Sequence, residues 1–209
     1  MLTFGPRAWT VGFVTRCRCL FTGVIFALSL VLASAADSQE GPKDSVVLII
    51  RHAEKPDTGP GLSPRGEQRA EAYKDYFKNF TVDSKLLRPN AVFAAKDSKQ
   101  SHRPYLTVKP FAKAENLPID MRFGSNESDH LAAALRATEQ GKVILICWRH
   151  EVIPDLLRDL GEKPKKLLPG GKWPDAVYDW VILLSFDQNG RLIPANTKRI
   201  TEHLLLGDS

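Results

Sequence analysis

The chain has 209 residues, of which 43% are hydrophobic and 25% are charged, and its formal net charge is +5 at pH 7. This composition is that of a globular protein, and the length suits one domain with a sizeable core. Three of the 29 basic residues, Arg7, Arg16 and Arg18, lie in the first 35 residues, which hold no acidic residue, so the rest of the chain carries only +2. Without a long run of Lys or Arg, that remainder offers no footprint for a nucleic acid.

The first 35 residues have the pattern of a secretory signal peptide. Their arginines precede an apolar run from Leu20 to Leu32, and Ala33-Ser34-Ala35-Ala36 follows as a small-residue cleavage site. We expect cleavage after Ala35 or Ala36 and an exported protein, periplasmic in a bacterium or secreted, without attachment to a membrane. An uncleaved anchor is the alternative, but the run is shorter than the ~20 apolar residues that cross a bilayer.

The segment after the signal is polar and contains Gly and Pro, so we expect residues 36–44 to be a disordered lead-in. Of the three cysteines, only Cys147 remains in the mature chain. A single thiol inside a strand cannot form an internal disulfide, so the fold must depend on its core and Cys147 is expected to be buried and inert. The absence of a disulfide favours a bacterial periplasm.

Strand and helix patterns alternate along the rest of the chain. Unbroken apolar stretches predict strands at 46–50, 91–95, 142–148 and 180–186, with a weaker one at 117–123. Amphipathic or capped segments between them predict helices, at 64–80, 101–116, 128–140 and 152–160. Residues 167–174 are typical of a loop, and a turn at 188–190 joins the last of these strands to a partner at 191–200.

This alternation indicates βαβ units, in which strands pair in parallel and helices cover the sheet. The expected fold is α/β: a three-layer α/β/α sandwich over residues 45–209. Its sheet should be mainly parallel, with an antiparallel C-terminal edge supplied by the final hairpin.

Two of the predicted strands end in the same pair of residues. Arg51 and His52 follow the first strand, and Arg149 and His150 follow a later one. Because ligands of open α/β sheets bind at the carboxyl edge of the strands, we expect both histidines in one site. A zinc site from His52, His102 and His150 is an alternative, but no HxH, HExxH or CxxC spacing supports it, so we expect neither a metal nor another cofactor.

An ordered set of motifs resembles the histidine phosphatase superfamily, which includes the phosphoglycerate mutases. The set consists of RHAEK after a buried strand, Leu62-Ser63-x-x-Gly66-x-x-x-Ala70, Arg103-x-x-x-Thr107, and an apolar strand that ends in His150. The match covers residues 46–157 in the order of the family. It implies that His52 is a nucleophile that becomes phosphorylated and that Arg51, Arg103 and His150 hold the phosphoryl group.

The residue types suit phosphoryl transfer independently of the resemblance. Arginine forks bind the oxygens of a phosphomonoester bidentately, so Arg51 and Arg103 can offset its charge. A neutral His52 is a competent nucleophile if a backbone carbonyl holds its other nitrogen as a donor. A protonated His150 would add a donor for the charge that develops in the transition state.

The leaving alcohol needs a proton from a carboxyl group with a raised pKa. The resemblance implies two positions for this general acid. Glu127 or Asp129 matches its position in one branch of the superfamily, and Glu151 lies near its position in the other branch. The sequence does not choose between them. Glu54 and Lys55 belong to the pocket loop, and we expect Glu54 to orient a pocket arginine.

The chain also departs from the family pattern beside the motif residues. Glu151 stands where Gly usually follows the second histidine, Ala53 replaces the commoner Gly after the nucleophile, and Lys99 stands where a Ser is expected, with Ser98 and Ser101 beside it. Aromatic side chains that are candidates for the pocket walls are Trp148, Trp173 and Tyr178.

The sequence therefore predicts an exported, metal-independent phosphatase that acts on a small phosphorylated substrate through a phosphohistidine at His52. A mutase is less favoured, because the mature chain is short and lacks room for the insertions that mutases use around substrate. The alternative from another class is a degenerate member that binds phosphate or a phospholigand without turnover.

Overall fold

The computed structural model describes residues 40–208. The expected signal peptide and its cleavage site lie outside these residues. Within the described range, no helix has the length and apolar character needed to cross a membrane.

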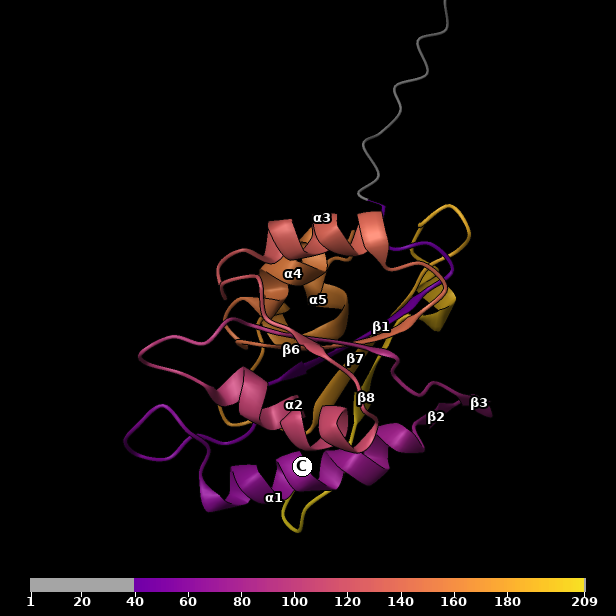
Figure 1. Cartoon of the computed structure of the whole chain (residues 1–209). Helices are drawn as coiled ribbons and strands as arrows, with labels where there is room; N and C mark the ends of the chain where they lie inside the picture. Colours follow the sequence, from indigo (N-terminus) through magenta and orange to yellow (C-terminus); the bar gives the residue numbers. More distant parts are fainter. Residues whose placement is uncertain (1–39, 209) are drawn as a thin grey trace, which may run out of the picture. The chain divides into compact units, whose positions relative to one another are not determined.

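Six strands form one mixed sheet in the order β5-β4-β6-β1-β7-β8 (Figure 1). Their bounds are β1 Val46–Arg51, β4 Ala91–Ala94, β5 Ile119–Asp120, β6 Val143–Trp148, β7 Trp180–Ser185 and β8 Lys198–Thr201. β1, β4, β5 and β6 pair in parallel, whereas β7 is antiparallel to both β1 and β8. The predicted parallel sheet with an antiparallel C-terminal edge is confirmed.

Helices cover both faces of this sheet, as Figure 1 shows. Their bounds are α1 Pro64–Lys78, α2 Arg103–Ala114, α3 Ser128–Thr138, α4 Ile153–Asp159 and α5 Pro164–Leu167, with short 3-10 turns η1 Pro169–Gly171 and η2 Pro194–Asn196. α1 and α2 pack on one face through Phe77 and Phe111, and α3 and α4 pack on the other through Leu131 and Leu156. The predicted three-layer sandwich is therefore confirmed.

The unbroken apolar sequence of β1 follows from its central place between these layers. Val47 and Ile49 belong to the core under α3 and α4, while Leu48 and Ile50 belong to the core under α1 and α2. All four side chains are fully buried. A strand with two buried faces cannot alternate polar and apolar residues, so the first polar side chains appear where β1 leaves the core.

Two local features differ from the sequence prediction. The strand expected at 117–123 is reduced to β5, because Pro118 has no N–H to donate to the ladder. A small hairpin of β2 Thr81–Val82 and β3 Lys85–Leu86 was not predicted. Its turn residues Asp83 and Ser84 both have positive φ, and Asp-Ser lacks the glycine that usually announces such a turn.

The described part of the expected lead-in contacts the domain. The Gly41 N–H donates to the Gly190 carbonyl at 2.6 Å, and the Asp44 N–H donates to the Asp187 carbonyl at 2.9 Å. Gly41 and Pro42 are buried. Residues 41–44 thus pack against the turn between β7 and β8.

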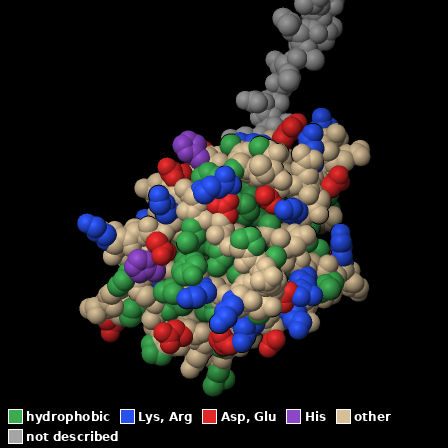
Figure 2. Space-filling view, in the orientation of Figure 1, with side chains coloured by type: hydrophobic (Ala, Val, Ile, Leu, Met, Phe, Trp, Pro, Cys, Tyr) green, Lys and Arg blue, Asp and Glu red, His purple; other side chains and the backbone are tan. Residues whose placement is uncertain are grey.

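Acidic and basic side chains are interspersed over the face of the molecule seen in Figure 2. Once the first 35 residues are set aside, the remaining basic residues nearly balance the 24 acidic residues of the chain.

Candidate active site

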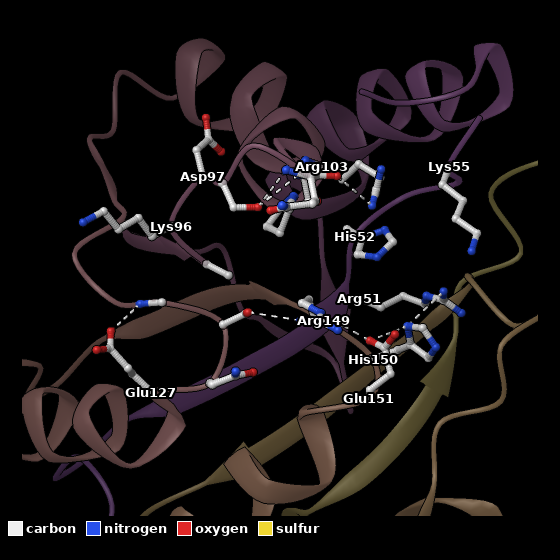
Figure 3. Close-up of a pocket in the computed structure, with 18 of the residues that line it drawn as sticks. Arg51, His52, Lys55, Lys96, Asp97, Arg103, Glu127, Arg149, His150 and Glu151 are labelled. Atoms are coloured by element: carbon white, nitrogen blue, oxygen red, sulfur yellow. Dashed lines mark hydrogen bonds and ion pairs between the residues drawn. The ribbon is translucent and has the colours of Figure 1, made fainter. Parts of the chain in front are cut away.

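The pocket lies beyond the carboxyl ends of β1 and β6, which are neighbours in the sheet (Figure 3). Their parallel pairing puts His52 and His150 side by side, with ring centroids 6.2 Å apart and ring planes at 79°. A cavity of about 900 Å³ opens above them. Of the predicted site residues, seven line it: Arg51, His52, Lys55, Arg103, Glu127, His150 and Glu151.

His52 has the hydrogen bond that a nucleophilic histidine needs. Its Nδ1 lies 2.8 Å from the Ala53 carbonyl oxygen, which can only accept, so Nδ1 carries the proton and Nε2 keeps its lone pair. Burial is the main cause that lowers the pKa of His52 to about 4, and the charges of Arg51 and Arg103 lower it as well. The hydrogen bond to the Ala53 carbonyl acts in the opposite direction. The ring is therefore neutral at pH 7.

Thr107 explains one of the recognised motifs in physical terms. Its fully buried hydroxyl accepts from the Ala53 N–H at 2.8 Å and donates to the Arg103 carbonyl at 2.8 Å. One side chain thus joins the residue after His52 to the first turn of α2. This connection fixes the position of Arg103 relative to the end of β1.

The motif around Ser63 and Gly66 fixes the other end of the same loop. Ser63 caps α1 by accepting from the Gly66 N–H at 3.1 Å, and its own N–H donates to the Glu54 carbonyl at 2.9 Å. A Cβ at position 66 would clash with that carbonyl oxygen. Glycine is therefore required for α1 to approach the loop that carries His52.

Arg51 is held by backbone carbonyls. Its Nη1 donates to the carbonyls of Pro174, Asp175 and Val177 at 3.2, 2.8 and 2.8 Å, and its guanidinium carbon lies 3.8 Å from the ring centroid of Tyr178. The residue is 2% exposed. Its Nε is buried and has no hydrogen-bond partner among the described residues.

Arg103 repeats this pattern at the start of α2. Its Nη1 donates to the Gly59 carbonyl at 3.2 Å, and its Nε is also buried without a partner in the described part of the chain. Burial lowers the pKa of Arg103, and the nearby charge of Arg149 lowers it further. Unpaired buried donors cost free energy, so both arginines are prepared for an anion with free acceptor oxygens.

His150 contacts an arginine and two carboxylates. Its Nε2 lies 2.8 Å from Asp175 Oδ1, and its Nδ1 lies 3.3 Å from Arg51 Nη2 and 3.2 Å from Glu151 Oε2. We expected a protonated ring, but burial and then Arg51 lower its pKa, so it is neutral at pH 7. In that state Nε2–H donates to Asp175 and Nδ1 accepts from Arg51; a bound dianion would raise the pKa again.

The expectation for Glu54 is wrong. Its carboxylate binds Arg69 Nη2 at 2.7 Å and Arg65 Nε at 3.2 Å, both on α1, and the side chain does not line the cavity. Arg69 also binds Asp208 at 2.7 Å and lies 3.6 Å from Glu202. Glu54 therefore belongs to a buried ion cluster behind the pocket and does not orient a pocket arginine.

The three expected acids are placed differently. Glu127 lines the cavity and accepts from the Gly124 N–H at 2.5 Å, whereas Asp129 is exposed, lies outside the lining and comes no closer than 4.0 Å to His130. Glu151 lines the cavity. Burial alone would raise the pKa of Glu151, but its own backbone N–H, His150 and Arg149 together lower it.

Tyr178, Asp175 and Arg149 are among the other residues that line the cavity, and the sequence predicted no catalytic role for them. Tyr178, considered only as a wall, lies under Arg51. Asp175 pairs with His150, and no motif in its Pro- and Gly-rich surroundings announces it. Arg149 belongs to the second Arg-His pair in the sequence, for which only His150 was predicted to have a role. The other candidate walls, Trp148 and Trp173, are buried in the core.

Comparison with known proteins concerns the fold. No model of a protein family matches the sequence, and no curated protein is similar to it in sequence. The protein histidine phosphatase SixA, complexed with tungstate, superposes with a TM-score of 0.51 and 16% identity, over 75% of this chain and 96% of that chain. A phosphoserine phosphatase from Entamoeba histolytica, in complex with 3-phosphoglyceric acid, gives a TM-score of 0.52 and 14% identity, over 77% and 100%. The chain thus has the α/β fold of the histidine phosphatases.

Proposed function

We propose that this chain is an exported phosphatase that hydrolyses a phosphomonoester through a phosphohistidine on His52, without a metal. The proposal combines the shared fold with the geometry of the pocket. In the two similar structures the proteins are phosphatases that hold tungstate and 3-phosphoglyceric acid. A small phosphorylated substrate is therefore the class of ligand that we assign to this pocket.

One observation carries the proposal: a neutral His52 faces the pocket beside two arginines whose Nε atoms are buried and unpaired. Phosphate oxygens would accept from N–H groups of both arginines and be balanced by both charges. The lone pair of His52 Nε2 would then face phosphorus. Preorganised donors of this kind supply most of the stabilisation in phosphoryl transfer.

The reaction has two steps. In the first, His52 Nε2 forms a bond to phosphorus while the bond from phosphorus to the leaving oxygen breaks with its electron pair. The leaving oxygen takes a proton from a carboxyl group, for which Glu151 and Glu127 are the expected acids that line the cavity. In the second step, water attacks phosphorus, the same carboxylate takes a proton from it, and His52 leaves as a neutral ring.

A phosphate-binding module without turnover is the second candidate function. It is favoured by the lowered pKa values of Glu151 and Asp175, since an acid that is ionised at pH 7 is a poor proton donor. For Asp175, the hydrogen bond to His150 is the main cause. Such a module would bind phosphate through the same arginines but would release no alcohol.

Labelling of His52 tests the proposal. Brief reaction with para-nitrophenyl phosphate, whose leaving group needs no proton, should leave one phosphoryl group that is labile to acid and stable to base, as an N–P bond is. His52→Ala should abolish both label and turnover. His150→Ala should slow formation and breakdown of the label without erasing it, since this residue stabilises charge.

The control for these variants is His130→Ala, because His130 is exposed on α3 and outside the pocket. It should keep the label and the turnover of the wild-type protein. Label that persists in His52→Ala at wild-type yield would contradict the assignment. Binding of phosphate with neither burst nor turnover would identify the binding module.

Export is tested separately. Protein recovered from the secreted or periplasmic fraction should begin at Ala36 or Asp37 by intact-mass measurement. Full-length protein that stays in the membrane would refute cleavage.

A further inference from the structure

The pocket is larger than a phosphoryl group requires. Its volume of about 900 Å³ is near the upper end of the ~300–1,000 Å³ that ligand pockets occupy. The phosphoryl site takes up the part over β1 and β6. The remainder lies over β6 and its other neighbour β4, where the β5–α3 loop forms the wall with Ser125, Asn126 and Glu127.

Arg149 is the arginine of this second part, which Lys96 also lines. In Figure 3 it lies beside Arg51, with Lys96 and Glu127 on the side away from His52. Because it directly follows β6 and precedes His150, the same strand end supplies both parts of the pocket. Its position is therefore set by the sheet and not by a mobile surface loop.

The existing contacts of Arg149 are long. Its Nη1 lies 3.4 Å from Ser125 Oγ and its Nε lies 3.5 Å from Glu151 Oε2, while 41% of the side chain is exposed. Arg122, on the same β5–α3 segment, differs: it donates to Asp120 from Nε and Nη2 at 2.7 to 3.0 Å. Arg122 already has its carboxylate, whereas the fork of Arg149 is not engaged bidentately by any described residue.

Each neighbouring carboxylate already has a partner in the protein. Glu127 is used to hold the Gly124 N–H, and Glu151 is shared between Arg149 and His150. Asp97 pairs with His102 at 2.9 Å. The charge of Arg149 also reaches Arg103, whose pKa it lowers, so the two guanidinium groups repel each other across the pocket.

We propose that Arg149, with Ser125 and Asn126, forms a second anion-binding subsite, so that the substrate is a small phosphomonoester with a second anionic group. The inference rests on the proposed function, since the first anion is the phosphoryl group at His52. Adjacent strands are about 4.8 Å apart, and β1 and β6 are neighbours, so one strand spacing puts the second group about 5 Å from phosphorus. A carboxylate or phosphate two to four atoms along the chain of a small molecule meets that distance.

Binding of phosphonates tests this inference without turnover. The ligands are 3-phosphonopropionate and 4-phosphonobutyrate, each compared with the alkylphosphonate of equal chain length, and 1,3-propylenediphosphonate to separate phosphate from carboxylate. In calorimetric titrations the wild-type protein should prefer the doubly anionic ligands by about tenfold or more, the scale of one charge-assisted hydrogen bond.

Arg149→Gln should bring this preference close to one, because glutamine cannot supply the charged fork. Arg122→Gln makes the same change in net charge on an arginine outside the cavity and should leave the preference intact. A preference that survives in Arg149→Gln, or is absent from the wild-type protein, would overturn the second subsite.

The outcomes also separate this inference from the proposed function. If alkylphosphonates bind and the second anionic group adds nothing, the second subsite is wrong and the phosphoryl site stands. If Arg149→Gln weakens all ligands equally, Arg149 serves the phosphoryl group and the second subsite is again wrong. If no phosphonate binds, both the second subsite and the proposed phosphoryl site are wrong.

Discussion

Two buried arginines, one at the end of β1 and one inside α1, have opposite environments. Arg69, 1% exposed, contacts three carboxylates, of Glu54, Asp208 and Glu202. Arg51, 2% exposed, contacts neutral carbonyls, a histidine and a tyrosine ring. One guanidinium is paired with the negative charges of Glu54 and Asp208, and the other is buried with an unpaired Nε.

The pKa values follow this difference. Burial alone would lower the pKa of Arg69, but its hydrogen bonds to Asp208 and Glu54 raise it above its ordinary value. Burial lowers the pKa of Arg51. Tyr178 and the carboxylates of Glu151, Asp175 and Glu54 raise it, but they offset only part of this decrease. A buried charge without a counter-ion is costly, so the environment of Arg51 makes sense when a ligand brings the missing negative charge. Charge pairing inside the protein therefore distinguishes a structural arginine from a ligand-binding one.

Replacement of Arg69 should have the largest effect on stability. Arg69→Met leaves the carboxylates of Glu54 and Asp208 without their main counter-ion, which should cost about 3–5 kcal/mol in the free energy of unfolding, measured with urea. Adding Glu54→Gln to this variant should restore part of the loss, because it removes one of the unpaired charges. A loss below about 1 kcal/mol would show that Arg65 can replace Arg69 in the cluster.

Replacement of Arg51 should act on turnover. Arg51→Met removes donors that face the phosphoryl group and should lower kcat by roughly 10²–10³-fold, with a smaller loss of stability than in Arg69→Met. Arg199 is a matched control, since it donates to the Leu167 carbonyl at 2.9 Å and stacks 4.0 Å over Trp180 outside the cavity. Arg199→Met should keep wild-type turnover. Equal turnover in the two variants would remove Arg51 from the site.

The smallest effect concerns the pH dependence of the ion cluster. Burial raises the pKa of Glu202 to about 8, above the ~4.3 of an unfolded chain, so only the folded state holds this proton between those values. Stability should fall as pH rises from 6 to 8, by up to about 1.4 kcal/mol per pH unit. Glu202→Gln cannot titrate and should flatten the slope in urea denaturation, whereas Glu71→Gln on exposed α1 surface should not. An unchanged slope in Glu202→Gln would assign the pH dependence to another group.

The fold was predictable because its central strands have two buried faces. The apolar sequence of β1 and of β6 identifies them, and the polar residues that follow mark the edge where the pocket lies. β5 and the β2–β3 hairpin were not predictable in the same way. Each of these strands has only two residues, and local turn geometry decides their extent.

The site was predictable where a residue adjoins a strand or a helix start. His52, His150 and Arg103 all do so, and all line one cavity. The contacts of Glu54 and Asp175 were not predictable. Glu54 binds Arg69, which also binds Asp208 in the C-terminal tail. Asp175 reaches His150 from an irregular loop. Such contacts depend on tertiary packing, which leaves no periodic signal in the sequence.

The parallel pairing of β1 with β6 has a consequence for folding kinetics. Arg51 and His150 are 99 residues apart in the chain, and the segment between their strands includes β4, which pairs with β6 on its other side. Contacts of such long range form slowly, because chain closure precedes the contacts that stabilise it. The pocket is then completed only when the centre of the sheet has assembled. In refolding from urea, phosphate binding should return with the late phase, after the helical signal.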